Sequence, residues 1–551
     1  MAIKIFTVAE MVAAERAADA AGVSYDEMME TAGRRVAEAI LERTAVEERH
    51  VLVLVGPGNN GGDGLVAGRY LAEAGADVVF YLYKPRDANV DINFARIQQM
   101  DLLFIEAGSD KNYVALATYL ANADIIIDAL LGTGVTRPID GNLAGLFKKV
   151  RAILATQAFL QIEADPLTSI VRAGAESRQQ QRRFILAVDC PSGLNCDTGS
   201  LDPLAMPADL TVTFAGAKRG HFRFPGAAAC GELVVADINI PVDLPEVMDV
   251  AVELATAKST LLLLPVRPTG GHKGTFGTAL IAAGSEHYWG APVLAAMGAY
   301  RVGAGLVALA VPEAVRATAA GQLPEATYPP LAATKVLDGE SARFLLGELG
   351  AVRGILVGPG LGPADSFMHA LLQPLRDQQT QSLADDFDFP PLVVDADGLN
   401  LLSRMPDWPA RLPADTVLTP HPGEMARLMG MSLSELKEID RVALAVDQAK
   451  AWGHVVLLKG AYTVVASADG RCTILPFANP LLAVGGSGDV LAGIIVGLLA
   501  QGLKPYDAAV LGGYLHGAAG ELAKEKFGDA GLLAGELADW IPEARRRILE
   551  I

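Results

Sequence analysis

The sequence predicts an α/β protein built from two doubly wound domains, each a three-layer α/β/α sandwich around a parallel sheet. Short apolar strands alternate with helical segments along the chain, and this alternation is typical of parallel sheets. The pattern of strand, glycine-rich loop and helix starts again near the middle of the chain. A length of 551 residues is sufficient for two large domains. We therefore expect a Rossmann-like first domain over residues 1–245 and a second domain over residues 250–551.

Composition and charge narrow the function classes. The net charge of −19 argues against a broad nucleic-acid surface, and the four cysteines are too few for a disulfide framework. Residues 1–16 lack the apolar core of a signal peptide. The apolar stretch at 490–502 is too short to span a membrane. We expect a cytoplasmic homo-oligomeric enzyme that binds small molecules and neither nucleic acid nor membrane.

The first domain carries its polar motifs where the expected strands end. Apolar runs at residues 50–55, 78–83, 123–128 and 184–188 predict buried strands. Ligands of doubly wound sheets bind beyond the carboxyl ends of the strands. The motifs at these ends therefore hold the candidate binding residues.

The first strand leads into a loop, Gly56-Pro-Gly-Asn-Asn-Gly-Gly-Asp-Gly64, whose first six residues match the dinucleotide pattern G-x-G-x-x-G. An NAD site also needs an acid at the end of the next strand, which here ends in Tyr83 and Lys84. A resident NAD cofactor is therefore not expected. The oxygens of Asn59, Asn60 and Asp63 suit a monovalent cation or ligand hydroxyls. A structural loop with capping Asn and Asp side chains is the alternative.

Two further strands end in an acid followed by a turn. Asp128 precedes Gly132-Thr-Gly-Val-Thr-Arg-Pro138, which offers backbone N–H groups, hydroxyls and a guanidinium group for phosphate. Asp189 precedes Pro191-Ser192-Gly193. One such acid could be a helix cap, but two acids with two glycine loops at one sheet edge favour a functional cleft.

These motifs resemble the NAD(P)H-hydrate epimerase family over nearly all of residues 1–240, although Thr31 stands where that family usually has Asn. The resemblance implies that Asn60, Asp128 and Ser192 hold a potassium ion and that a hydrated nicotinamide nucleotide is the substrate. Epimerisation at its hydrated carbon needs proton transfer, for which Asp189 is the candidate acid/base. The implied substrate contacts are Asn59, Asn60, Gly61, Gly62, Asp63, Gly132, Thr133, Gly134, Val135, Thr136, Arg137, Pro138 and Asp189.

The second domain contains a glycine loop, Gly485-Gly-Ser-Gly-Asp489, before the apolar helix expected at 490–499. Such a loop at a helix N-terminus binds anions through free N–H groups and the helix dipole. Phosphoryl transfer needs this charge stabilisation, and Asp489 could accept a proton from a substrate hydroxyl. A capped, buried helix is the alternative.

Four other strand ends of this domain carry glycine or polar clusters: 358–362, 395–400, 419–424 and 459–463. Residues 395–400 could position substrate or a magnesium-bound phosphate, or could be helix caps. His421 lies at the end of an expected strand and is expected to contact a ligand. The segment from Lys459 could meet a nucleotide or could be a hairpin turn.

Together these motifs resemble the ribokinase-like superfamily and, within it, the ADP-dependent NAD(P)H-hydrate dehydratase family over residues 255–551. That family usually has Thr or Met at the position of Ser487. The resemblance implies ADP as co-substrate with Mg²⁺. The implied nucleotide contacts are Lys459, Gly460, Ala461, Tyr462, Thr463 and Gly488, and the implied hydrate contacts are Gly305, Gly362, His421 and the catalytic Asp489.

The two resemblances imply one repair route. The first domain would interconvert the R and S forms of NAD(P)H hydrate, and the second would dehydrate the S form with ADP, giving AMP and phosphate. Phosphorylation helps because phosphate leaves readily and hydroxide does not. The rivals are a kinase of a vitamin precursor or sugar with an accessory first domain, and a nucleotide-binding regulator without turnover.

Residues 157–183 and 376–390 are expected to be surface segments, and 237–254 an inter-domain linker.

Overall fold

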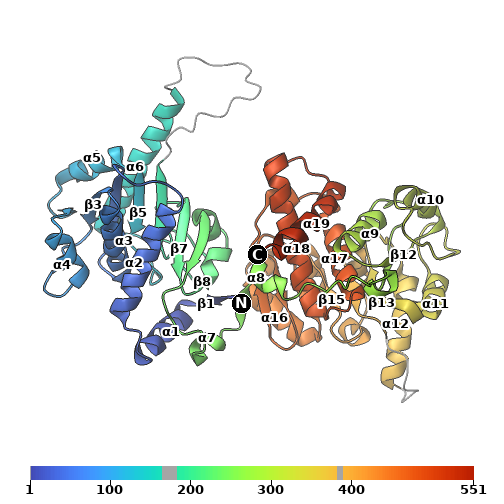
Figure 1. Ribbon diagram of the computed structural model, residues 1–551. Coiled ribbons are helices and arrows are strands. Elements are labelled where there is room, and N and C mark those ends of the chain that lie inside the picture. The colour runs from blue at the N-terminus through green and yellow to red at the C-terminus, as the bar shows by residue number, and fades with distance from the viewer. Residues whose placement is uncertain (1, 164–182, 381–388) are drawn as a thin grey trace. The chain divides into compact units, whose positions relative to one another are not determined.

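The computed structural model describes residues 2–163, 183–380 and 389–551 (Figure 1). The chain divides into two compact units: Lys4–Val250 is the first, and Ala251–Ile551 forms the bulk of the second. Each unit contains a mainly parallel sheet covered by helices, so the predicted α/β fold class is confirmed. Residues 164–182 and 381–388, within the two polar stretches, lie outside the described residues.

In the described residues of the first unit, the main sheet has seven parallel strands in the order β4-β3-β2-β5-β6-β7-β9. The order reverses between β2 and β5, which is the switch point where such sheets bind ligands. The strands are β2 (His50–Val55), β3 (Asp77–Leu82), β4 (Leu103–Glu106), β5 (Ile125–Ala129), β6 (Phe184–Val188), β7 (Leu210–Phe214) and β9 (Glu232–Ala236), and a separate parallel pair joins β1 (Ile3–Phe6) to β8 (Ala217–Lys218).

Helices cover both faces of this sheet, which explains why its strands are apolar throughout. On β2, Val53 packs into the cluster that includes α2 and α3, whereas Leu52 and Leu54 pack into the cluster that includes α5 and α6. Alternate side chains of a strand point to opposite faces, so both sets must be apolar. The helices are α1 (Val8–Ala20), α2 (Tyr25–Leu41), α3 (Asn59–Glu73), α4 (Ile92–Gln99), α5 (Val114–Asn122), α6 (Gly141–Glu163) and α7 (Pro245–Met248).

Helix α3 begins at Asn59, so the loop expected as far as Gly64 is shorter than the sequence indicates. The glycines there serve close packing. A Cβ on Gly61 would lie 2.1 Å from the Gly56 carbonyl oxygen, and one on Gly64 would lie 2.5 Å from the Cβ of Ala129. The missing side chains let the first turns of α3 approach the sheet edge.

The second unit has the strand order β12-β11-β13-β14-β15-β16-β17-β18-β10, and β17 runs antiparallel to both of its neighbours. The segment expected to be a linker therefore contributes a strand, because β10 pairs in parallel with β18. The strands are β10 (Val252–Leu254), β11 (Thr278–Ala282), β12 (Leu306–Ala310), β13 (Val352–Val357), β14 (Leu392–Val394), β15 (Val417–Leu418), β16 (Val455–Leu458), β17 (Val464–Ala466) and β18 (Cys472–Ile474).

Helix α17 (Ser487–Ala500) is the central helix of this unit, and its residues from Val490 onward are buried. A Cβ on Gly493 would lie 1.9 Å from the Ala295 carbonyl oxygen, so this glycine allows α17 to pack tightly against α9.

No helix in the described part of the chain is long and apolar enough to cross a membrane. The other helices are α8 (Ala257–Leu261), α9 (Ala291–Val302), α10 (Glu313–Gln322), α11 (Gly339–Gly347), α12 (Asp365–Thr380), α13 (Asp397–Leu402), α14 (Pro422–Met429), α15 (Leu433–Lys437), α16 (Arg441–Trp452), α18 (Pro505–Phe527) and α19 (Ala534–Leu549).

Candidate active sites

A pocket of about 660 Å³ lies at the switch point of the first unit. Its lining joins Asn59 and Asn60 to all of residues 132–138, so the structure brings these two predicted loops together. The amide nitrogen of Asn60 donates a hydrogen bond of 3.0 Å to the Leu131 carbonyl and connects α3 to the second loop. Tyr83 and Lys84, which were not among the predicted contacts, also line it.

Gly61, Gly62 and Asp63 lie behind the pocket rather than in its described lining. They are buried in the first turns of α3. A Cβ on Gly62 would lie 2.6 Å from the Met29 sulfur of α2, which shows that this side of α3 faces its neighbouring helix. Asp189 is likewise outside the described lining.

Asp128 and Ser192 form a buried network at the ends of β5 and β6. The Ser192 hydroxyl donates to Asp128 Oδ1 at 2.6 Å, and the Ser192 amide donates to Oδ2 at 2.9 Å. Asp128 has no exposed surface, and no ion pair to it is found among the described residues. Burial raises the pKa of Asp128, although these hydrogen bonds oppose the rise. Among the described residues, the buried Asp128 carboxyl group therefore has the Ser192 hydroxyl and backbone N–H groups as partners and no cation.

Asp189 has an unusual backbone and an unusual partner. Its φ is +62°, a conformation that residues with side chains rarely adopt and that often marks functional sites. Its Oδ1 accepts hydrogen bonds from Lys218 Nζ at 2.5 Å and from the Thr213 hydroxyl at 2.8 Å. Burial favours the neutral acid, but Lys218 and the Thr213 hydrogen bond outweigh burial and lower the pKa of Asp189. Lys218 was not among the site residues predicted from the sequence.

In the second unit, the predicted glycine loop forms the N-terminus of α17. Gly486 is the N-cap with φ of +92°, and Asp489 lies in the first helical turn. The Ser487 hydroxyl donates to the Leu482 carbonyl at 2.9 Å, and His516 Nε2 lies 2.9 Å from the Ser487 carbonyl oxygen. The Ser487 N–H also donates to the Val484 carbonyl at 3.3 Å. The N-terminus of α17 at Gly488 is therefore the part of this turn that suits an anion.

Four predicted motifs converge beside this turn. Lys459 Nζ lies 2.6 Å from Asp395 Oδ1 and 3.6 Å from Glu424 Oε2. A Cβ on Gly488 would lie 3.5 Å from Lys459 Nζ, so the glycine loop closely approaches this lysine. Burial, followed by repulsion from Asp395, raises the pKa of Asp489 to about 7. Burial also raises the pKa of Glu424 to about 7, against the attraction of Lys459.

The segment from Lys459 to Thr463 fits both interpretations of its sequence. It connects the antiparallel strands β16 and β17, so it is a hairpin turn, and it also delivers Lys459 to the acidic cluster. The Arg441 guanidinium group stabilises this turn by donating hydrogen bonds to the carbonyls of Ala461 at 2.6 Å and Lys459 at 3.2 Å.

His421 caps α14, and its Nδ1 accepts the Gly423 amide at 2.9 Å. Its Nε2 lies 3.3 Å from Glu424 Oε1, so it borders the acidic cluster. Burial and the positive charge of Lys459 lower the pKa of His421.

Gly362 and Gly305, the two glycines predicted to contact the hydrate, are placed differently. The Gly362 amide donates to Asp397 Oδ2 at 3.0 Å, and Asp397 is close enough to affect Asp489. Gly305 packs against the backbone of Lys273, and among the described contacts none joins it to the cluster.

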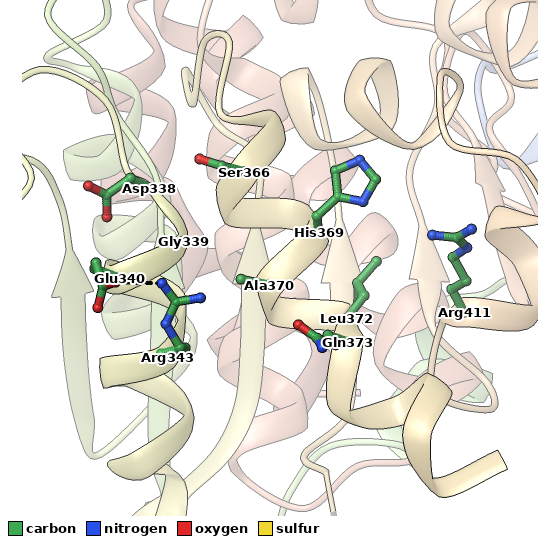
Figure 2. A pocket seen from close by; sticks show the side chains of 10 residues that line it. All are labelled: Asp338, Gly339, Glu340, Arg343, Ser366, His369, Ala370, Leu372, Gln373 and Arg411. Atoms are coloured by element: carbon green, nitrogen blue, oxygen red, sulfur yellow. Dashed lines mark hydrogen bonds and ion pairs between the residues drawn. The ribbon is translucent and has the colours of Figure 1, made fainter. Parts of the chain in front are cut away.

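Another hollow of about 560 Å³ lies between α11 and α12 in this unit (Figure 2). Its lining contains both signs of charge, and Arg343 is already paired with Glu340 at 2.6 Å. None of the predicted site residues lines it. We therefore place the candidate active site at the acidic cluster.

Two family models match the chain. One, described as YjeF-related protein N-terminus, matches residues 25–220, and the other, described as NAD(P)H-hydrate dehydratase, matches residues 279–543. The bifunctional NAD(P)H-hydrate repair enzyme Nnr of Moorella thermoacetica is 39% identical, over 95% of this chain and 93% of the relative. The enzyme of the same name from Thermofilum pendens is 35% identical, over 100% and 97%.

A solved structure also matches the second unit. The ADP/ATP-dependent NAD(P)H-hydrate dehydratase from Bacillus subtilis, co-crystallized with ATP and Mg²⁺, is 34% identical. It covers 54% of this chain and 98% of that chain, with a TM-score of 0.44.

The fold and its two polar sites define a two-domain α/β enzyme with a glycine-rich turn at the start of α17 in its second unit. The full-length relatives specify the family. The chain belongs to the family of bifunctional NAD(P)H-hydrate repair enzymes, and the similarity does not favour a vitamin-precursor kinase.

Proposed function

We propose that this chain repairs hydrated NADH and NADPH. The first unit interconverts the R and S hydrates, and the second dehydrates the S form at the expense of ADP, giving AMP and phosphate. The observation that carries this proposal is the convergence of Asp395, Lys459 and Asp489 beside the glycine turn of α17. That arrangement combines an anion site with a buried acid/base, which phosphoryl transfer to a hydroxyl requires.

In the dehydratase, Asp489 accepts the proton of the hydrate hydroxyl while the hydroxyl oxygen attacks the terminal phosphorus of ADP. The phosphorus–oxygen bond to AMP breaks, and the N–H groups near Gly488 and the Lys459 ammonium stabilise the negative charge. The phosphate then leaves with the hydroxyl oxygen, and loss of a proton from the adjacent carbon restores the double bond. We assign nucleotide contacts to residues 459–463 and hydrate contacts to Gly362 and His421.

The same cluster suits a magnesium ion bound through phosphates. Asp395, Glu424 and Asp489 lie near a single lysine, Lys459, and Asp397 lies near Asp489, so acidic groups are in excess. No group of three acids, histidines or cysteines in the described residues is close enough to form a metal cage. Mg²⁺ is commonly held by one or two carboxylates together with substrate phosphates. When bound, it would neutralise charge on those phosphates.

In the epimerase, we assign the pocket formed by Asn59, Asn60 and residues 132–138 to the hydrated nucleotide, and we assign proton transfer to Asp189. Asn60, Asp128 and Ser192 would hold potassium, which would supply the positive charge that buried Asp128 lacks. The protein is proposed to act as a homo-oligomer.

A direct test uses chemically hydrated NADPH, the full-length protein and ADP, with absorbance at 340 nm as the readout. We expect the absorbance to return only when both protein and ADP are present. ATP in a parallel reaction measures the nucleotide preference. Absence of recovery with either nucleotide would contradict the proposed function.

A further inference from the structure

Lys218 is the most deeply buried cation described in the first unit, with 1% of its surface exposed. A buried lysine is rarely tolerated unless its charge is paired. Its three donors are all used: Nζ contacts Asp189 Oδ1 at 2.5 Å, the Thr213 hydroxyl at 2.8 Å and the Phe214 carbonyl at 3.3 Å. The ammonium group is therefore fixed against one oxygen of the proposed acid/base.

The turn after β7 and the short strand β8 bring Lys218 to Asp189. After β7, Ala215 adopts a φ of +59°, and the chain turns back through β8, which ends at Lys218. The Lys218 amide donates to His221 Nδ1 at 3.2 Å, which holds the following turn. Within the described residues, Asp189 Oδ2 accepts no hydrogen bond, so it is the oxygen available to a substrate proton.

Several other titratable groups influence this site. Burial, followed by repulsion from Asp189 and Glu15, raises the pKa of Asp63 well above its usual value. The titratable groups that face Asp189 are Glu15 from α1, Asp63 from α3, Cys190 and Cys196 from the turn after β6, and Lys218 and His221.

We propose that Lys218 is a positioning residue of the epimerase, which holds Asp189 as the ionised base. This inference rests on the proposed function. Asp189 Oδ2 takes the proton of the hydrate hydroxyl, and the bond between that carbon and the ring nitrogen breaks. The electron pair goes to nitrogen, which receives that proton from Asp189. Closure on the other face of the resulting carbonyl reverses the proton transfer and inverts the carbon.

The test is the pH profile of epimerisation, measured by chromatographic separation of the R and S hydrates with the uncatalysed rate subtracted. Lys218→Met removes the charge and Lys218→Arg keeps it. In the wild type, kcat/KM should rise with pH as Asp189 ionises, and this rise is the acidic limb of the profile. In Lys218→Met, we expect the acidic limb to shift to higher pH by about 1–3 pH units, because Asp189 loses the cation that favours its ionised form. KM for the hydrate should change little. Lys218→Arg should leave the limb close to that of the wild type.

Thr213→Val provides a milder change at the same oxygen, because the Thr213 hydroxyl contacts both Asp189 and Lys218. It should shift the limb in the same direction by less than about one unit, which keeps the proposal testable if Lys218→Met does not fold. Lys148→Met removes an exposed lysine of α6 and should have no effect.

An unchanged acidic limb in folded Lys218→Met or in Thr213→Val would overturn the role of Lys218. If the wild-type protein does not epimerise the hydrate, the proposed function itself fails.

Discussion

The two proposed acid/base residues, Asp189 and Asp489, lie in opposite electrostatic settings. Lys218 contacts Asp189 directly at 2.5 Å, and the pKa of Asp189 is lowered despite burial. In the second unit Lys459 contacts Asp395 instead, and the pKa of Asp489 rises to about 7. Each site contains one lysine among several acids. The carboxyl group that Lys218 contacts has a lowered pKa, whereas Asp489, whose neighbouring Lys459 is paired with Asp395, has a raised pKa.

The largest expected effect comes from removing the base of the second site. Asp489→Asn should lower the rate of ADP-dependent dehydration by about 10³-fold, within the range for loss of a general base. ADP binding should persist, because the glycine turn and Lys459 remain. Single-turnover recovery of absorbance and calorimetric titration with ADP would measure the two properties. Asp447→Asn, at an exposed position of α16, is the matched control. Loss of ADP binding with unchanged chemistry would contradict the assignment.

Removing the lysine of the second site tests how much Lys459 contributes to stability and to ADP binding. Lys459→Met would leave Asp395, which is only 2% exposed, without its cation. Breaking such a buried pair typically costs about 3–5 kcal/mol, so we expect the free energy of unfolding of this unit to fall by that order. Urea denaturation followed by far-ultraviolet circular dichroism would measure it. Bound ADP should stabilise the variant less than the wild type, and equal stabilisation would argue against phosphate contact.

The two activities should differ in their pH dependence. Asp489 must be ionised to accept a proton, so kcat/KM for dehydration should increase as pH rises through about 7 and then level off. Epimerisation by Asp189, whose pKa is lowered, should already be on its plateau at that pH. Separate assays from pH 5 to pH 9 would compare them. Coincident acidic limbs would show that the lysine contacts do not set the two ionisation states.

The smallest expected effect concerns the hairpin that delivers Lys459. Arg441→Lys would replace a guanidinium fork, which holds two carbonyls of this turn, by a single ammonium group. We expect KM for ADP to rise about tenfold, equivalent to about 1.4 kcal/mol, with little change in kcat. Arg343→Lys, at the hollow shown in Figure 2, is the control. An unchanged KM would mean that the turn does not need this support.

Much of this comparison could be predicted from sequence because the carboxyl ends of parallel strands share one edge of a sheet. Asp395, His421 and Lys459 each follow a strand, and the structure places them together. Lys218 gave no such signal. It lies 29 residues after Asp189, and only the turn after β7 returns it to that carboxylate. A lysine directly after the apolar segment 214–217 was the one available indication.

Helix boundaries were the other feature that sequence alone predicted poorly. Consecutive glycines at 61–62 indicate a loop by propensity, yet they lie in the first turn of α3, where the Gly56 carbonyl and the Met29 side chain of α2 leave no room for side chains. Tertiary packing decides this boundary. The strand β10 was missed for a similar reason: a run of three residues, Val252–Leu254, is too short to show a period and depends on pairing with β18.

The most direct test of the account is complementation between two inactive chains. Asp189→Ala and Asp489→Asn are each supplied with pure R hydrate of NADPH and ADP, separately and then mixed. We predict that neither alone restores 340 nm absorbance above the spontaneous rate. The mixture should restore it, because one chain epimerises the hydrate and the other dehydrates it. Recovery by either variant alone would contradict the division of the repair reaction between Asp189 and Asp489, as would failure of the mixture.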